Sequence, residues 1–163
     1  HNKRSARTPS VYLTTSQGKA MTDLDVVLSN VAVRTKEVMS GRPVYLVEPC
    51  KLKDAFKRLI DFFGPENVYL STITAIDKPQ EKTIEVSYFI NIISERRVLV
   101  LRCRIDRNAP RLPSLIEFTG LHSGELETYD LFGVVFEGNP YLKRGAFVSE
   151  DLVKKNVYPL RKG

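Results

Sequence analysis

The clearest periodic pattern of the chain lies between residues 52 and 63. Apolar side chains recur there at steps of three and four, while charged side chains occupy most of the positions between them. The apolar positions are Leu52, Ala55, Phe56, Leu59, Ile60 and Phe63. This spacing gathers them on one face of an α-helix, and Gly64 followed by Pro65 is typical of a helix end. The sequence therefore predicts an amphipathic helix over this segment.

Strand patterns stand on both sides of this helix. From Val31 to Val47, apolar residues alternate around Ser40-Gly41, which indicates two antiparallel strands joined by a turn. Three more strands are expected at Val68 to Asp77, Thr83 to Ile93 and Arg97 to Asp106. A strand pair, a helix and three strands with short links are typical of an α+β domain.

The expected fold class is thus α+β, with a small, mostly antiparallel sheet, a packed amphipathic helix, short helices after it and an extended C-terminal tail. The short helices are expected over Asp23 to Leu28 with Thr22 as the cap, over Leu115 to Phe118, and after Ser123. Periodicity is lost beyond Gly133. The expected parts are a basic flexible arm (1–21), the α+β domain (22–133) and an extended tail that wraps a partner (134–163).

Length and composition limit the chain to one sizeable core, because it has 163 residues. No apolar run approaches the roughly 18 residues of a membrane-spanning helix. The net charge of +6 belongs to the two ends, which are rich in Lys and Arg, whereas the middle is close to neutral. Cys50 and Cys103 have no Cys or His neighbour at metal-ligand spacing, so we expect reduced structural thiols and no zinc or iron-sulfur site.

The densest polar cluster comprises Glu125, Glu127 and Asp130, with Tyr129 among them. Glu127 and Asp130 share a face of the expected helix, so a paired-carboxylate acid/base site is one interpretation. The favoured interpretation is structural, because acids in the first turns of a helix stabilise its N-terminus or pair with basic groups. A nucleophile and base at His122-Ser123 is disfavoured, since adjacent side chains do not generally point at one another.

Four arginines occur in and after the last expected strand: Arg102, Arg104, Arg107 and Arg111. A solvated face of the sheet is the favoured interpretation, and an acidic partner or a nucleic-acid backbone is the other. A small basic RNA-binding module is therefore the alternative function, supported by charge alone. Aromatic side chains that could stack on bases are not interleaved with these arginines.

The last 30 residues are apolar but irregular. Their larger apolar side chains are Phe136, Tyr141, Leu142, Phe147, Val157, Tyr158 and Leu160. No spacing among them would bury them against one another as a regular helix or strand. We therefore expect that partner contacts order this segment and cover most of these side chains.

Three blocks in this C-terminal third carry a resemblance to a known family. The motif residues are Glu125, Glu127, Tyr129, Asp130 and Gly133 in the first block, Phe136, Pro140, Leu142, Lys143 and Arg144 in the second, and Tyr158, Pro159, Leu160, Arg161 and Lys162 in the third. In this order and with these gaps, the blocks resemble the 30-kDa subunit family of respiratory complex I, the C-type subunit of NADH:quinone oxidoreductase. The resemblance implies that these residues serve the interface with partner subunits.

Two positions depart from the pattern of that family. Leu126 stands where the family has Arg, and Asn139 stands where it has the His before Pro140. Loss of the Arg leaves Glu125 and Glu127 to find other cations. We expect Glu125, Glu127 and Asp130 to pair with basic groups or backbone N–H donors where the domain meets its tail. The resemblance places Arg144 just after the turn at Pro140, which makes it the leading partner for the acids within the chain.

The resemblance implies a non-catalytic structural subunit of the peripheral arm of a complex I-like redox complex. Relatives of the family also occur in archaeal membrane-bound hydrogenases and sulfur-reducing complexes, and the choice between these and complex I proper stays open. The implied partners are the large catalytic subunit and the iron-sulfur subunits, which would hold the iron-sulfur clusters and the NiFe or quinone site. The chain itself would bind no cofactor, metal or nucleic acid, and it would reach the cytoplasmic side of the membrane only through the complex.

Overall fold

A computed structural model of the chain describes residues 13–14, 20–21 and 23–163. Strands β1 (Leu13–Thr14) and β2 (Ala20–Met21) pair antiparallel, and α1 (Asp23–Val27) follows them. Most of the basic arm expected over residues 1–21, together with the expected cap Thr22, lies outside the described residues. The helix expected from Asp23 onward is confirmed.

Five strands form the central sheet, in the order β3-β4-β7-β6-β5. Their bounds are β3 Val33–Met39, β4 Arg42–Leu46, β5 Val68–Lys78, β6 Thr83–Ile92 and β7 Arg97–Asp106. All neighbouring pairs are antiparallel except β4 and β7, which are parallel. The expected small, mostly antiparallel sheet is confirmed, and its strands begin and end within two residues of the expected positions.

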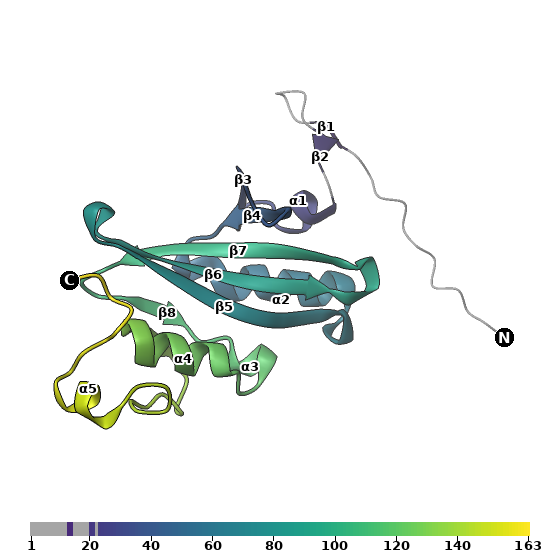
Figure 1. Ribbon diagram of the computed structural model, residues 1–163. Helices are drawn as coiled ribbons and strands as arrows, with labels where there is room; N and C mark the ends of the chain where they lie inside the picture. Colours follow the sequence, from purple (N-terminus) through teal and green to yellow (C-terminus); the bar gives the residue numbers. More distant parts are fainter. Residues whose placement is uncertain (1–12, 15–19, 22) are drawn as a thin grey trace.

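Helix α2 (Leu52–Phe63) connects β4 to β5 and packs on one face of the sheet, behind the central strands in Figure 1. Its buried side chains are Leu52, Ala55, Phe56 and Leu59, which belong to the apolar stripe of the sequence. The helix ends at Gly64, whose φ of 90° suits a residue without a side chain. Short 3-10 turns join the other elements at Pro49–Lys51, Pro65–Asn67, Pro79–Glu81 and Ile93–Glu95.

The remaining elements pack beside α2 and below the sheet in Figure 1. They are β8 (Arg111–Pro113), α3 (Ile116–Thr119), α4 (Ser123–Phe132), β9 (Val135–Glu137) and α5 (Glu150–Lys154). Strand β9 pairs in parallel with β8, and the side chain of Phe136 is buried in the core. The expectation that a partner chain covers Phe136 is therefore wrong. A three-residue strand is too short for its alternation to be recognised in the sequence. The pairing of β9 with β8 joins residues beyond Gly133 to the rest of the fold.

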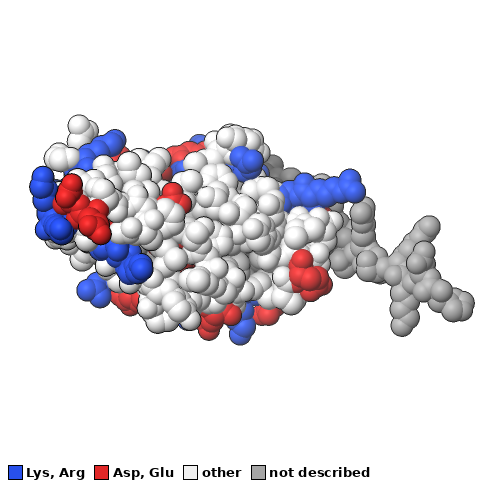
Figure 2. Space-filling view, turned by 60° about the horizontal axis from the view of Figure 1, so that its bottom comes forward, with Lys and Arg blue, Asp and Glu red and all other residues white. Residues whose placement is uncertain are grey.

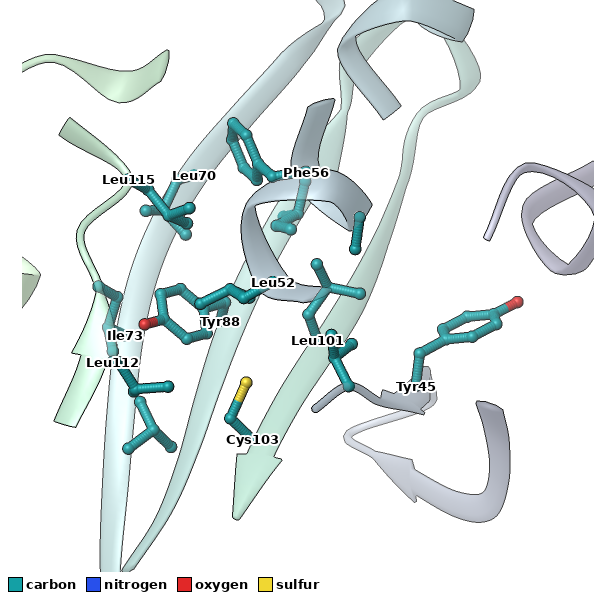
Figure 3. Close-up of a cluster of buried hydrophobic side chains, with 14 of the residues drawn as sticks. Tyr45, Leu52, Phe56, Leu70, Ile73, Tyr88, Leu101, Cys103, Leu112 and Leu115 are labelled. Atoms are coloured by element: carbon teal, nitrogen blue, oxygen red, sulfur yellow. The ribbon is translucent and has the colours of Figure 1, made fainter. Parts of the chain in front are cut away.

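One core fills the space between the sheet and these elements. In Figure 3, Tyr88 of β6 lies among Leu52 of α2, Ile73 of β5 and Leu112 of β8. Burial raises the pKa of the nearby Cys103 thiol to about 12, so this thiol stays protonated at neutral pH and packs as a small apolar group. Cys50, by contrast, is exposed.

The opposite face of the sheet carries an ion-pair network instead of a solvated row of arginines. Arg102 is 4% exposed, and its Nε lies 3.2 Å from the Glu85 carboxylate. Arg104 and Lys78 also approach Glu85, at 3.3 and 3.0 Å. The expected solvated or nucleic-acid-binding face is therefore wrong for Arg102, because the neighbouring strand β6 supplies Glu85 two positions from Ser87, the residue opposite Arg102, and β3 supplies Glu37.

We predict that Leu59→Ala lowers the free energy of unfolding by about 2–5 kcal/mol, because it removes a fully buried side chain from the interface of α2 and the sheet. Urea denaturation of the chain measures this change. Lys57→Ala is the control on the exposed face of the same helix, where we expect a change within about 0.5 kcal/mol. Equal effects of the two substitutions would contradict the packing of α2 described above.

Candidate functional site

Three buried carboxylates fasten residues 138–163, the C-terminal segment, to the rest of the fold. Asp77, Glu125 and Asp130 are each at most 1% exposed, and we call them the anchor carboxylates. Each accepts at least one hydrogen bond from the C-terminal segment. They come from the end of β5 and from two inward positions of α4, so they hold the segment at three separate points.

Asp130 holds the loop before α5. Its carboxylate accepts hydrogen bonds from Nε of Arg144 at 2.9 Å and from the backbone amides of Gly145 and Phe147 at 3.0 and 2.8 Å. Burial by itself raises the pKa of Asp130, but the two amides and the guanidinium outweigh burial, so the pKa lies below its ordinary value. The expected pairing of Asp130 with Arg144 is confirmed.

Arg144 links this loop to the third motif block. Its guanidinium lies 4.0 Å from the centre of the Tyr158 ring, and it also donates to the carbonyl of Val157. The same ring covers Gly133, where a side chain would meet ring atoms at 3.2 Å. Gly133 also has a φ of 78°, so both the backbone and the ring contact require glycine here. Four residues of the motif thus form one cluster.

Glu125 holds the turn after β9 through neutral donors. It accepts from the Ser114 hydroxyl at 2.6 Å, from the Leu115 amide at 2.9 Å and from the Asn139 side chain at 3.1 Å. The expected pairing of Glu125 with a basic group or a backbone N–H donor is confirmed by the Leu115 amide, and among the described residues no cation takes the place of the missing Arg. Asn139 also accepts from the amide of Tyr141, so this departure from the family pattern fixes the turn itself.

Asp77 holds the end of the chain. Arg107 donates to both of its oxygens, at 2.7 and 3.0 Å, and the backbone amide of Lys162 donates at 2.6 Å. Arg161 lies beside the same carboxylate and donates to the carbonyl of Arg107 at 2.9 Å. Burial raises the pKa of Asp77, but these hydrogen bonds and the nearby arginines outweigh it and hold the pKa below its ordinary value.

Asp77 and Arg107 belong to this site although the sequence patterns did not predict their roles. A signal for Asp77 was present, because Ile73, Ala75 and Asp77 alternate on the buried face of β5 and an acid at such a position needs a partner. Which donors would reach Asp77 depends on folding, since Lys162 lies 85 positions away along the chain.

The remaining acid of the cluster behaves differently. Glu127 is exposed, whereas Asp130 points inward, so the two carboxylates do not form a paired site. The expected pairing of Glu127 is not found among the described residues; because its side chain is exposed, water can solvate the charge.

His122 caps α4: its Nδ1 accepts from the amide of Gly124 at 3.0 Å, and its Nε2 lies 3.0 Å from the carbonyl oxygen of Leu70. Both ring nitrogens are thus engaged in structural contacts.

The other motif residues are half-buried or exposed, and all of them except Tyr129 of α4 belong to the C-terminal segment. Tyr129 and Leu142 are half-buried, while Pro140, Lys143 and Pro159 are exposed. Four large apolar side chains of the segment are also exposed: Tyr141, Phe147, Val157 and Leu160. Figure 2 views the molecule from below: the middle of this side is largely uncharged, and Lys, Arg, Asp and Glu gather at its margins, including the end that carries α5 in Figure 1. A segment fixed by polar bonds thus presents apolar side chains to the outside.

Known proteins resemble this chain in both sequence and fold. The model of the family described as respiratory-chain NADH dehydrogenase, 30 Kd subunit, matches residues 45–163. The C-type subunit of the NADH-quinone oxidoreductase of Moorella thermoacetica is 34% identical, over 58% of this chain and 62% of the relative. The C-type subunit of the F(420)H(2) dehydrogenase of Methanosarcina mazei is 30% identical, over 58% of both chains. The matches thus span about six tenths of the length of these two relatives.

A longer match is found with the C-type subunit of the NADH-quinone oxidoreductase of a Roseiflexus species, which is 31% identical over 85% of this chain and 78% of the relative. Among solved structures, a chain of the archaeal membrane-bound sulfane sulfur reductase superposes with a TM-score of 0.68 at 22% identity, covering 85% of this chain and 81% of that one. A trypsin-resistant fragment of Nqo5 superposes with a TM-score of 0.54 at 22% identity, covering 73% of this chain and 96% of the fragment. These structures share the fold.

We predict that Asp130→Asn releases the loop at residues 144–147. The substitution leaves the Arg144 guanidinium without its carboxylate, and we expect a loss of about 2–4 kcal/mol in the free energy of unfolding. Faster amide hydrogen exchange at Gly145 and Phe147 would localise the effect. Glu127→Gln is the matched control, since it neutralises an exposed acid on the same helix and should leave both measurements unchanged.

The lowered pKa values of Asp77 and Asp130 also predict a pH dependence. The pKa of each carboxyl is lowered in the folded chain from its ordinary value of 3.8, so its stabilising contribution is complete above about pH 4 and is lost as the pH falls through the lower folded pKa. Acid should therefore loosen the C-terminal segment below about pH 4. Asp130→Asn should flatten this part of the stability profile, and an unchanged slope would show that Asp130 does not contribute to it.

Proposed function

Since the chain belongs to the family of the 30-kDa subunit of respiratory-chain NADH dehydrogenase, we propose that it is a non-catalytic structural subunit of a complex I-like redox complex. In this proposal the C-terminal segment clamps the large catalytic subunit and the adjacent iron-sulfur subunit. Whether that complex reduces quinone, releases hydrogen or reduces sulfur is left open. The redox centres belong to the partner subunits.

The observation that carries the proposal is the outward presentation of apolar side chains on a fastened backbone. Tyr141, Phe147 and Leu160 are 57%, 47% and 49% exposed, although the backbone amides of all three are hydrogen-bonded within the fold. Exposed apolar side chains at fixed positions are typical of anchors that enter pockets of a partner. Lys143 and Lys162 are exposed in the same segment and can meet acidic groups around such pockets.

The chemistry of the candidate acids supports a structural role. Asp77, Glu125 and Asp130 each accept several hydrogen bonds. The pKa values of Asp77 and Asp130 are lowered, which makes these two carboxyls poor general acids at neutral pH. Within residues 23–163, no group of three or more His, Cys, Asp or Glu side chains is arranged to hold a metal ion.

Membrane attachment in the proposal is indirect. Among the described residues, no helix is long and apolar enough to cross a membrane. The Moorella and M. mazei relatives are subunits of an oxidoreductase and a dehydrogenase, and the superposed sulfane sulfur reductase is a membrane complex. We therefore place this chain in the peripheral arm, on the cytoplasmic side, where partner subunits hold it at the membrane.

The test is assembly in the host with an affinity-tagged chain. We predict that Phe147→Ser combined with Tyr141→Ser lowers the yield of purified complex about tenfold or more, because the two substitutions remove exposed anchors. The isolated variant should unfold at the same urea concentration as the original chain. Phe62→Ser, which removes an exposed phenylalanine from α2, is the matched control and should assemble normally.

Turnover separates a structural role from a catalytic one. Complex that does assemble with the double variant should show normal turnover per assembled complex. A normal yield with lost turnover would contradict the proposal, and so would a tagged chain that purifies with salt-sensitive nucleic acid and no metal-containing subunits.

A further inference from the structure

A second candidate site lies at the other end of the sheet. A cavity of about 430 Å³ opens between α1, the β3–β4 hairpin and the β6–β7 turn. Four of its ten lining residues are arginines, namely Arg34, Arg42, Arg96 and Arg97, and none of the ten is Asp or Glu. We call this cavity the arginine cleft. It lies within the size range of ordinary ligand and peptide-anchor pockets.

Three of the four arginines of the cleft lack the carboxylate partners that other arginines of the fold possess. Arg34 lies 3.5 Å from Asp25, which also accepts the Tyr45 hydroxyl. Within residues 23–163, Arg42, Arg96 and Arg97 take part in no ion pair. By contrast, Arg102, Arg107 and Arg144 each bind a carboxylate elsewhere in the fold.

Arg97 is the cleft arginine whose buried nitrogen atoms lack hydrogen-bond partners among the described residues. Its Nε and Nη2 atoms are buried and find no hydrogen-bond partner in the described part of the chain, although the side chain lines the cleft. A guanidinium that is partly withdrawn from water without a counter-charge is costly, and an anion in the cleft would compensate it. Guanidinium groups bind carboxylates through paired hydrogen bonds, so the cleft suits an oxyanion.

The backbone holds these side chains in place without help from a ligand. Arg97 is the first residue of β7 and lies opposite Ile92, and Arg96 sits in the turn with a φ of 50°. Arg42 begins β4, and its guanidinium lies 5.7 Å from the centre of the Phe89 ring. Two strand starts and a tight turn thus bring the three arginines to one end of the sheet.

Exposed apolar side chains flank the cleft. Val38 is 64% exposed and pairs with Pro43, which lines the cleft. Ile93 is 56% exposed and its carbonyl accepts from the amide of Arg96. A free small anion has no use for apolar neighbours, whereas a polypeptide can place apolar side chains on them while an acidic side chain enters the cleft.

We infer that the arginine cleft is a docking site for an acidic segment of a partner polypeptide. A Glu or Asp carboxylate of that segment binds among Arg42, Arg96 and Arg97, and neighbouring apolar side chains contact Val38 and Ile93. This surface is distinct from the C-terminal segment. Arg97 lies opposite Ile92 at one end of β6, whereas the Asp77 anchor lies at the other end, roughly 30 Å away by the rise of a ten-residue strand.

The first test titrates the chain with hexaglutamate and, separately, with inorganic phosphate, and follows backbone amide signals by NMR. We expect hexaglutamate to shift signals at Gly41, Arg42 and residues 96–98, and Arg96→Glu to weaken its affinity about tenfold. Arg97→Gln is the second variant and should weaken it likewise. Lys57→Glu, an equal charge reversal on the exposed face of α2, should leave the affinity unchanged. Phosphate binding at the same residues without hexaglutamate binding would overturn the inference in favour of a small-anion site.

The second test uses the assembled complex purified from the host. A photoreactive amino acid at Ile93 should cross-link to a segment of another subunit that carries Glu or Asp next to the cross-linked position, and Arg96→Glu should reduce that product several-fold. Cross-linking to a second copy of this chain, to a segment without acids, or to nothing would overturn the inference. If the cross-linking result overturns the inference but the complex assembles normally, the proposed role of the C-terminal segment still stands. The two proposals can therefore be tested independently.

Discussion

The burial of three carboxylates under the C-terminal segment is the interaction on which the rest of this structure depends. An ionised carboxylate withdrawn from water without partners costs several kcal/mol, so Asp77, Glu125 and Asp130 must keep their donors as long as the domain is folded. Those donors come partly from the segment itself, through Asn139, the loop at 144–147 and Lys162. The segment cannot leave without exposing or stranding these charges, which couples its position to the fold of the domain.

This coupling explains how an irregular segment can be fixed while its apolar side chains face outward. Regular elements fix their backbones through their own ladders of hydrogen bonds, and the segment has only the five-residue helix α5. The anchor carboxylates supply the missing acceptors for the Gly145, Phe147 and Lys162 amides. Because polar groups do the fixing, Tyr141, Phe147 and Leu160 remain available. A surface that is ordered before it binds loses less conformational entropy on binding, and this favours a clamp.

The sequence predicted the regular elements well, because α2 has a regular apolar period, β6 alternates cleanly, and β5 and β7 are long apolar runs bounded by turns. It also predicted the Asp130–Arg144 pair, since the family pattern placed Arg144 just after the turn at Pro140. The three-residue strand β9 was missed, because so short a strand has no recognisable alternation, and the inward position of Phe136 was therefore not predicted. Contacts between residues far apart in the sequence were not predicted either. The pairing of Asp77 with Arg107 and Lys162, and that of Arg102 with Glu85, depends on which strands become neighbours.

Glu125 shows how a buried acid can lose a cation and stay compensated. In the family pattern an Arg stands at position 126 and a His at position 139, and this chain has Leu126 and Asn139 instead. The amide of Asn139 donates to Glu125, and the hydroxyl of Ser114 and the backbone of Leu115 supply the other donors. Hydrogen bonds from three neutral donors can compensate the burial of a carboxyl group without a cation. The turn that begins the C-terminal segment is thus fixed to a buried acid by neutral donors, and Asn139, one of the two residues that depart from the family pattern, is among these donors.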